Sequence, residues 1–107
     1  MITIQSALRS LNVTGTLAGF RYTAAALSLI LKDEDWLSNL NKKLYPYLAG
    51  QFGCSIVSVS SAISYLISKV WELDQEKKLE EMAGFPLYKA PSNQQFLTIL
   101  YNYIIRS

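Results

Sequence analysis

The sequence lacks histidine altogether and has a single cysteine, Cys54. Histidine is the commonest general base and a frequent metal ligand, so its absence removes the usual centre of acid-base catalysis and of transition-metal binding. One cysteine cannot form an internal disulfide, which fits a reducing compartment. Because there is also no phosphate-cradling glycine-rich loop, we expect no enzymatic activity, no metal and no cofactor.

A strong excess of one charge is also missing. Ten Lys and Arg against eight Asp and Glu give a formal charge of +2, well below the basic excess of a protein that coats nucleic acid. No run reaches the roughly 18 to 20 uninterrupted apolar residues needed to cross a bilayer, and no charged leader with an apolar run and cleavage site opens the chain. We therefore expect a cytoplasmic protein without membrane contact.

Proline and glycine are scarce, and the apolar residues recur at spacings of three and four, which indicates helices rather than strands. A chain of 107 residues, half of them apolar, can form one hydrophobic core. We predict an all-α fold, a single domain over residues 1–107 built as a compact bundle of about six helices. The segments with helical character are 2–11, 17–31, a segment after 33–35, 46–52, 56–73, an exposed charged helix over 74–82, and a last helix that opens at Ser92 with the core face Phe96, Ile99, Leu100 and Tyr103.

An acidic cluster at residues 33–35 precedes Trp36. Acidic side chains suit the positive N-terminal end of a helix, so we read the cluster as the start of a third helix. A divalent-metal site is the weaker alternative, since consecutive acids on a helix point in different directions and no companion ligands lie nearby in the sequence.

The middle of the chain has the order of a helix-turn-helix. Pro46 suits the first turn of a short helix that Gly53 ends, and Ser55 is a good N-cap for the long helix that follows. Short helix, glycine turn and longer amphipathic helix is the order of that motif, although any tight pair of core helices could share it. The apolar stripe of the long helix comprises Ile56, Val59, Ile63, Leu66, Ile67 and Val70.

The same region resembles a known family. The residues that carry the resemblance are Gly19-Phe20-Arg21-Tyr22, Leu44-Tyr45-Pro46, Ala49, Phe52, Val59, Ala62-Ile63, Ile67 and Trp71, followed by Gly84-Phe85, Lys89-Ala90-Pro91-Ser92-Asn93 and Phe96. Together they resemble the C-terminal effector domain of the stage zero sporulation response regulator, the DNA-binding half of a transcription regulator. The resemblance implies a six-helix all-α domain with an embedded helix-turn-helix. The receiver domain of that regulator is missing here, so regulation by phosphorylation is not carried over.

The departures from the family concern base reading. In the family, the outer face of the second motif helix carries arginines, a glutamate and a histidine that contact bases and phosphates, and the matching positions here are Ser58, Ser60, Ser61, Ser64 and Tyr65. An arginine fork on guanine contributes roughly 1 to 3 kcal/mol of discrimination, whereas serine offers one short hydroxyl and no charge. The resemblance therefore implies DNA binding with weakened base readout.

Lysines supply the remaining electrostatic attraction. Between Trp36 and Trp71 the chain has Lys42, Lys43 and Lys69 and no acid, which predicts a locally positive surface. Lys42 matches a lysine of the family and ranks above Lys43. The predicted contacts to duplex DNA are thus Ser58, Ser60, Ser61, Ser64, Tyr65 and Lys69, with Lys42 on the DNA backbone. Exposed lysines that only solubilise helix faces are the alternative.

The serine row with Tyr65 also suits contact with a protein. Small hydroxyl side chains allow close helix approach, and an aromatic ring with a polar tip is a frequent interface anchor. The second hypothesis is therefore a scaffold that has lost DNA binding and acts as a protein-interaction module or homodimer. The family contacts the polymerase sigma subunit after this helix, but residues 74–81 here are densely charged and unlike the family. Cys54 is read as a small buried residue rather than a reactive thiol.

Overall fold

The computed structural model describes residues 2–74 and 77–107, and within them all regular structure is helical. The predicted all-α bundle is confirmed. The elements are α1 (Ile4–Arg9), α2 (Ala18–Lys32), α3 (Asp35–Ser38), the π-helical turn η1 (Leu40–Leu44), α4 (Tyr45–Phe52), α5 (Ile56–Leu73), α6 (Lys78–Ala83) and α7 (Asn93–Arg106).

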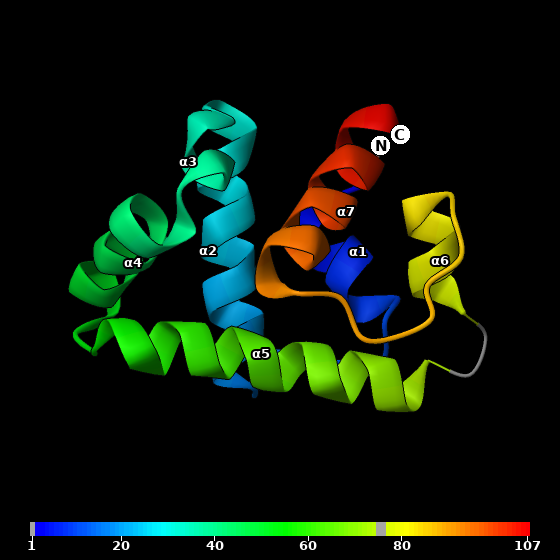
Figure 1. Ribbon diagram of the computed structural model, residues 1–107, viewed down its shortest axis with the longest axis horizontal. Helices are drawn as coiled ribbons and strands as arrows, with labels where there is room; N and C mark the ends of the chain where they lie inside the picture. Colours follow the sequence, from blue (N-terminus) through cyan, green and yellow to red (C-terminus); the bar gives the residue numbers. More distant parts are fainter. Residues whose placement is uncertain (1, 75–76) are drawn as a thin grey trace.

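Helix α5 lies along one side of the molecule, and the other helices stand on it (Figure 1). Helices α2 and α7 both pack on α5, α3 and α4 occupy one end, and α6 occupies the other. The two ends of the chain lie together, since the Ile2 backbone N–H donates to the Ser107 hydroxyl at 3.2 Å. This arrangement leaves one long side of α5 without a covering element (Figure 1).

A single apolar cluster joins α1, α2, η1, α4, α5, α6 and α7. The predicted stripe of α5 is buried in it from Val59 to Val70. Ile56 is the exception at 43% exposed, because it lies in the first turn, at the edge of the core. In the last helix Phe96, Ile99 and Leu100 are buried as predicted, while Tyr103 is half-buried.

The helix expected after the acidic cluster breaks after a single turn. At Asn39 the backbone leaves helical geometry (φ −149°), and the chain re-enters it through η1. There the Tyr45 N–H donates to the Leu40 carbonyl, so helical backbone precedes Pro46; α4 begins one residue earlier than predicted, and Pro46 lies in its first turn as predicted. Proline is tolerated because it still lies in the first turn of α4, where its missing N–H breaks no α-helical bond.

The charged helix expected over 74–82 begins later, at Lys78, and residues 75–76 of that expectation lie outside the described residues. The Asp74 carboxylate accepts hydrogen bonds from the backbone N–H groups of Lys78 (2.8 Å) and Leu79 (2.9 Å), which stabilises the helix start. The helix is not wholly exposed as predicted, since Leu79 and Met82 are buried. Its two apolar residues attach it to the core.

By length and composition alone, α5 would meet the requirement for a membrane span. One face of α5 covers the core, however, and serines are spaced along the other. This amphipathic pattern is that of a core helix in a globular protein.

Candidate nucleic-acid interface

Helices α4 and α5 are joined by a tight turn. Gly53 ends α4 in the left-handed region (φ 65°), and the Cys54 N–H donates back to the Ala49 carbonyl at 3.0 Å. The Ser55 hydroxyl then accepts from the Ser58 N–H at 3.0 Å and caps α5. Ala49 and Val59 are buried where the two helices pack. The predicted arrangement of a short helix, a glycine turn and a long helix is confirmed.

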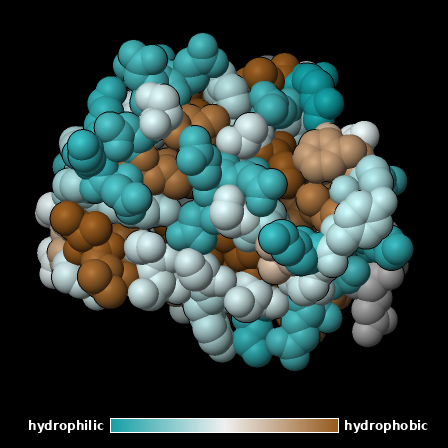
Figure 2. All heavy atoms as spheres, in the orientation of Figure 1, coloured by the Kyte–Doolittle hydropathy of each residue, from teal (hydrophilic) through white to brown (hydrophobic). Residues whose placement is uncertain are grey.

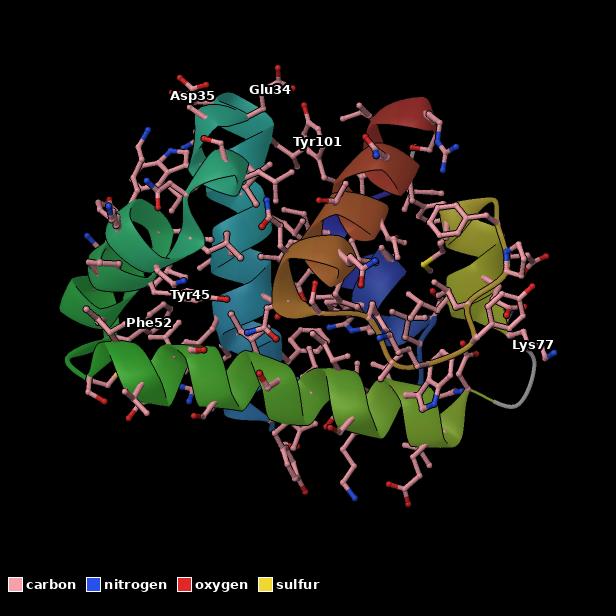
Figure 3. The ribbon with its side chains drawn as sticks, in the orientation of Figure 1. Glu34, Asp35, Tyr45, Phe52, Lys77 and Tyr101 are labelled. Carbon is pink, nitrogen blue, oxygen red and sulfur yellow. The ribbon has the colours of Figure 1, made fainter. Side chains whose placement is uncertain are left out.

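The outer face of α5 holds most of the predicted DNA contacts. Ser58, Ser61, Ser64 and Tyr65 are exposed, and side chains of α5 project away from the rest of the molecule (Figure 3). Ser60 is half-buried at the edge of this face. The hydroxyl side of the long helix is therefore turned outward and accessible to a partner.

Some of these hydroxyls already have partners within the chain. The Ser55 hydroxyl donates to that of Ser58 at 2.9 Å, and the Ser64 hydroxyl donates to the Asn93 side-chain oxygen at 2.9 Å. Among the described residues, the side chains of Ser60 and Ser61 make no hydrogen bond. Ser61 is consequently the exposed serine whose hydroxyl can meet a ligand without breaking an internal bond.

Asn93, in the first turn of α7, links three helices. Its amide nitrogen donates to the Tyr45 hydroxyl at 3.0 Å and to the Ser60 carbonyl at 3.1 Å, and its oxygen accepts from Ser64. Tyr45 reaches this point from α4 (Figure 3). Asn93 thus fixes the middle of α5 against α4 and α7. No functional role for Asn93 was predicted from the sequence, although its position directly after the predicted cap Ser92 places it at a helix end.

A polar hollow of about 370 Å³ lies beside this network. It brings together Asn39 and Asn41 near the π turn, Ser60 of α5, and Ser92 and Gln94 at the start of α7. Lys42 is exposed in the same π turn as Asn41. Polar groups far apart in the sequence therefore meet at one edge of the outer face of α5.

The predicted positive surface is weaker than the sequence indicated. Lys69 is half-buried, its Nζ lies 3.6 Å from the Glu72 carboxylate, and it also lies 5.6 Å from the centre of the Tyr65 ring. Glu72 falls one residue beyond the acid-free stretch, but the helix turns it back towards Lys69. Lys43 is held over the Trp36 ring at 4.8 Å. Among the described lysines of this stretch, Lys42 makes no ion pair or ring contact.

Cys54 occupies the turn of the motif and is half-buried. Its Sγ lies 3.6 Å from the Tyr22 hydroxyl, and the Tyr22 ring packs edge-on against Phe52 with centroids 4.9 Å apart. The hydrogen bond with Cys54 raises the pKa of Tyr22, and burial raises it further. These contacts attach the turn to α2 and give the thiol a structural partner.

The comparison with protein families matches the family described as sporulation initiation factor Spo0A C terminal over residues 4–104. The match runs from the first residue of α1 almost to the end of α7. The chain belongs to the Spo0A C-terminal family. This family consists of DNA-binding effector domains of a sporulation regulator and is not an enzyme family. In this Spo0A C-terminal domain, the outward face of α5 is the candidate DNA contact.

Proposed function

We propose that this Spo0A C-terminal domain binds duplex DNA by placing the outer face of α5 in the major groove. Ser58, Ser60, Ser61, Ser64, Tyr65 and Lys69 would face the groove, and Lys42 would contact the backbone. The observation that carries the proposal is the 18-residue second helix of a helix-turn-helix with its polar face turned outward and uncovered.

Base readout through this face is weak. Serine can bond a base edge or a phosphate, but it lacks the charge and the two-pronged geometry of arginine. Lys69 is partly neutralised by Glu72. The affinity should therefore lie near the non-specific range, with a Kd of about 10⁻⁴ to 10⁻⁶ M. Contacts from Lys42 and Lys69 give a shallow slope of log K against log salt, no steeper than about −2.

Fluorescence anisotropy with labelled duplex DNA at low salt tests the proposal. Lys42→Ala should weaken binding and make the salt slope shallower by about 0.9, and Tyr65→Ala should weaken binding at any salt concentration. Lys32→Ala is the matched control, because Lys32 is exposed at the end of α2 that lies away from α5 (Figure 1). Equal effects of the two lysine variants, or no saturable binding up to about 1 mM protein, which is tenfold above the weakest expected Kd, would overturn it.

A second candidate function is contact with a protein or with a second copy of the chain. It is favoured by exposed apolar side chains around the turn of the motif: Phe52 (40% exposed), Ile56 (43%) and Val57 (71%). Figure 2 shows a hydrophobic group at this end of α5. Such groups are common where proteins associate. Sedimentation should then show self-association that Val57→Ser abolishes and that Ile105→Ser, at an exposed position on α7, leaves unchanged.

A further inference from the structure

A cavity of about 260 Å³ lies between α6 and α7. Met82, Phe85 and Ile99 form its apolar lining. Asn102 and Arg106, in the C-terminal part of α7, also line it. None of the predicted DNA contacts lines it. It is therefore a separate feature of the molecule, which the DNA-binding function does not explain.

Arg106 is fixed across the edge of this cavity. One Nη donates to the Met82 carbonyl at 2.8 Å, and Nε donates to the Asn102 carbonyl at 3.1 Å. These bonds hold the guanidinium in one place and leave its other N–H groups without a partner among the described residues. No described carboxylate lies within ion-pair distance of it, and Arg106 is the one charged residue of the lining.

An oriented arginine beside an apolar hollow suits one class of ligand. A guanidinium binds a carboxylate through two parallel hydrogen bonds, and such bonds between charged groups are stronger than neutral ones. Arg106 is the one cation of the lining, so the cavity offers a single positive charge to a ligand. The charge therefore fits a monoanion better than a phosphate dianion.

We propose that this cavity binds a small amphipathic carboxylate. Its apolar body lies against Met82, Phe85 and Ile99, and its carboxylate receives hydrogen bonds from Arg106. The cavity is slightly smaller than the roughly 300 Å³ at which sites for drug-sized ligands begin, so the ligand is the size of a medium-chain or aryl carboxylic acid. Phe85, which is 52% exposed, becomes covered when the ligand binds.

An NMR titration of the ¹⁵N-labelled protein with octanoate, in the absence of DNA, tests the site. Saturable shifts are expected at Met82, Phe85 and Ile99, and octanamide, which has the same size and no charge, should bind at least about fivefold more weakly. Arg106→Gln should lower the affinity for octanoate by about the same factor, whereas Arg106→Lys should lower it less. Lys32→Gln, which removes a distant positive charge, is the matched control and should change nothing.

Equal binding of octanoate and octanamide would overturn the proposal, as would shifts that map elsewhere or no saturation up to about 20 mM octanoate. Arg106 also bonds a carbonyl of α6, so thermal unfolding of each variant checks that it is folded. Should Arg106→Gln fail to fold, the comparison of the two ligands on the unaltered protein still decides the matter.

Discussion

Gly19 of α2 lies in direct backbone contact with Ala62 of α5. A Cβ atom placed on Gly19 would come within 2.3 Å of the Ala62 carbonyl oxygen and 2.8 Å of the Leu66 Cβ. Backbone atoms cannot move aside as the end of a flexible side chain can. The absence of a side chain at Gly19 therefore sets how closely α2 packs against the helix that carries the candidate DNA contacts.

Gly19→Ala should destabilise the domain by about 2 to 3 kcal/mol, because the added methyl group forces the two helices apart. Urea unfolding followed by circular dichroism measures the change. Gly50→Ala is the matched control: Gly50 is exposed in α4, and a Cβ added there would meet no side chain or neighbouring helix of the described chain within 4 Å. There the substitution should stabilise the domain by about 0.5 to 1 kcal/mol. Changes of the same sign in both variants would contradict the packing argument.

Asn93→Ala should destabilise the domain by about 1 to 2 kcal/mol, because it leaves the Tyr45 and Ser64 hydroxyls without their Asn93 partner and removes the second hydrogen bond to the Ser60 carbonyl. It should also weaken DNA binding, since Asn93 holds α5 in place against α4 and α7. Denaturant unfolding and anisotropy on the same samples measure both effects. Asn102→Ala is the control, because the Asn102 side chain makes no hydrogen bond among the described residues. Equal losses in the two variants would argue against a special role for Asn93.

Features that depend on neighbouring residues were predictable from the sequence. Ser55 caps α5 and Gly53 ends α4 as predicted, because each needs only the backbone groups of the adjacent turn. The same holds for the reciprocal bonds between Ser92 and Gln95 at the start of α7. The buried stripe of α5 also followed from its periodicity. Ile56 is the exception, because the packing of the whole fold decides where the core ends along the helix.

The missed features depend on contacts between distant parts of the chain. Asn93 bonds residues 33 and 48 positions away, which no local pattern indicates. The π turn before Pro46 was missed because proline usually marks a helix start. The local charge was overstated because the acid-free stretch ended one residue before Glu72, and the helix brings Glu72 back to Lys69. The individual DNA contacts are still predictions, made from the sequence and from the outward orientation of the α5 face.

Stability should fall as the pH rises above about 10, the ordinary tyrosine pKa. The pKa of Tyr22 is raised by its bond with Cys54 and then by burial, so the folded state keeps a proton that the unfolded state releases. The stabilisation is complete below the unfolded pKa and is lost as the pH rises through the folded one. Tyr22→Phe should flatten the dependence between about pH 9 and 11, measured by denaturant unfolding.

Tyr101→Phe is the comparison for that experiment. Burial and then the nearby Glu34 carboxylate raise the pKa of Tyr101, which gives the same sign of pH dependence. The Tyr101 hydroxyl donates to Glu34 at 3.3 Å near one end of α7 (Figure 3). Tyr101 is only half-buried, whereas Tyr22 is 8% exposed. Tyr22→Phe should therefore change the pH dependence of stability more than Tyr101→Phe does. A larger change in Tyr101→Phe would contradict the assignment of the pH dependence to the Tyr22–Cys54 contact.

Ser61→Arg should strengthen DNA binding. Ser61 is exposed on the outer face of α5, and its side chain makes no hydrogen bond among the described residues, so an arginine there reaches outward without breaking a contact. One added phosphate contact steepens the slope of log K against log salt by about 0.9, and a bond to a guanine edge adds about 1 to 3 kcal/mol on a suitable site. Gln5→Arg adds the same charge on α1 and is the control for a purely global effect. If both variants raise the affinity equally, the gain comes from net charge, and the outer face of α5 is not the surface that meets DNA.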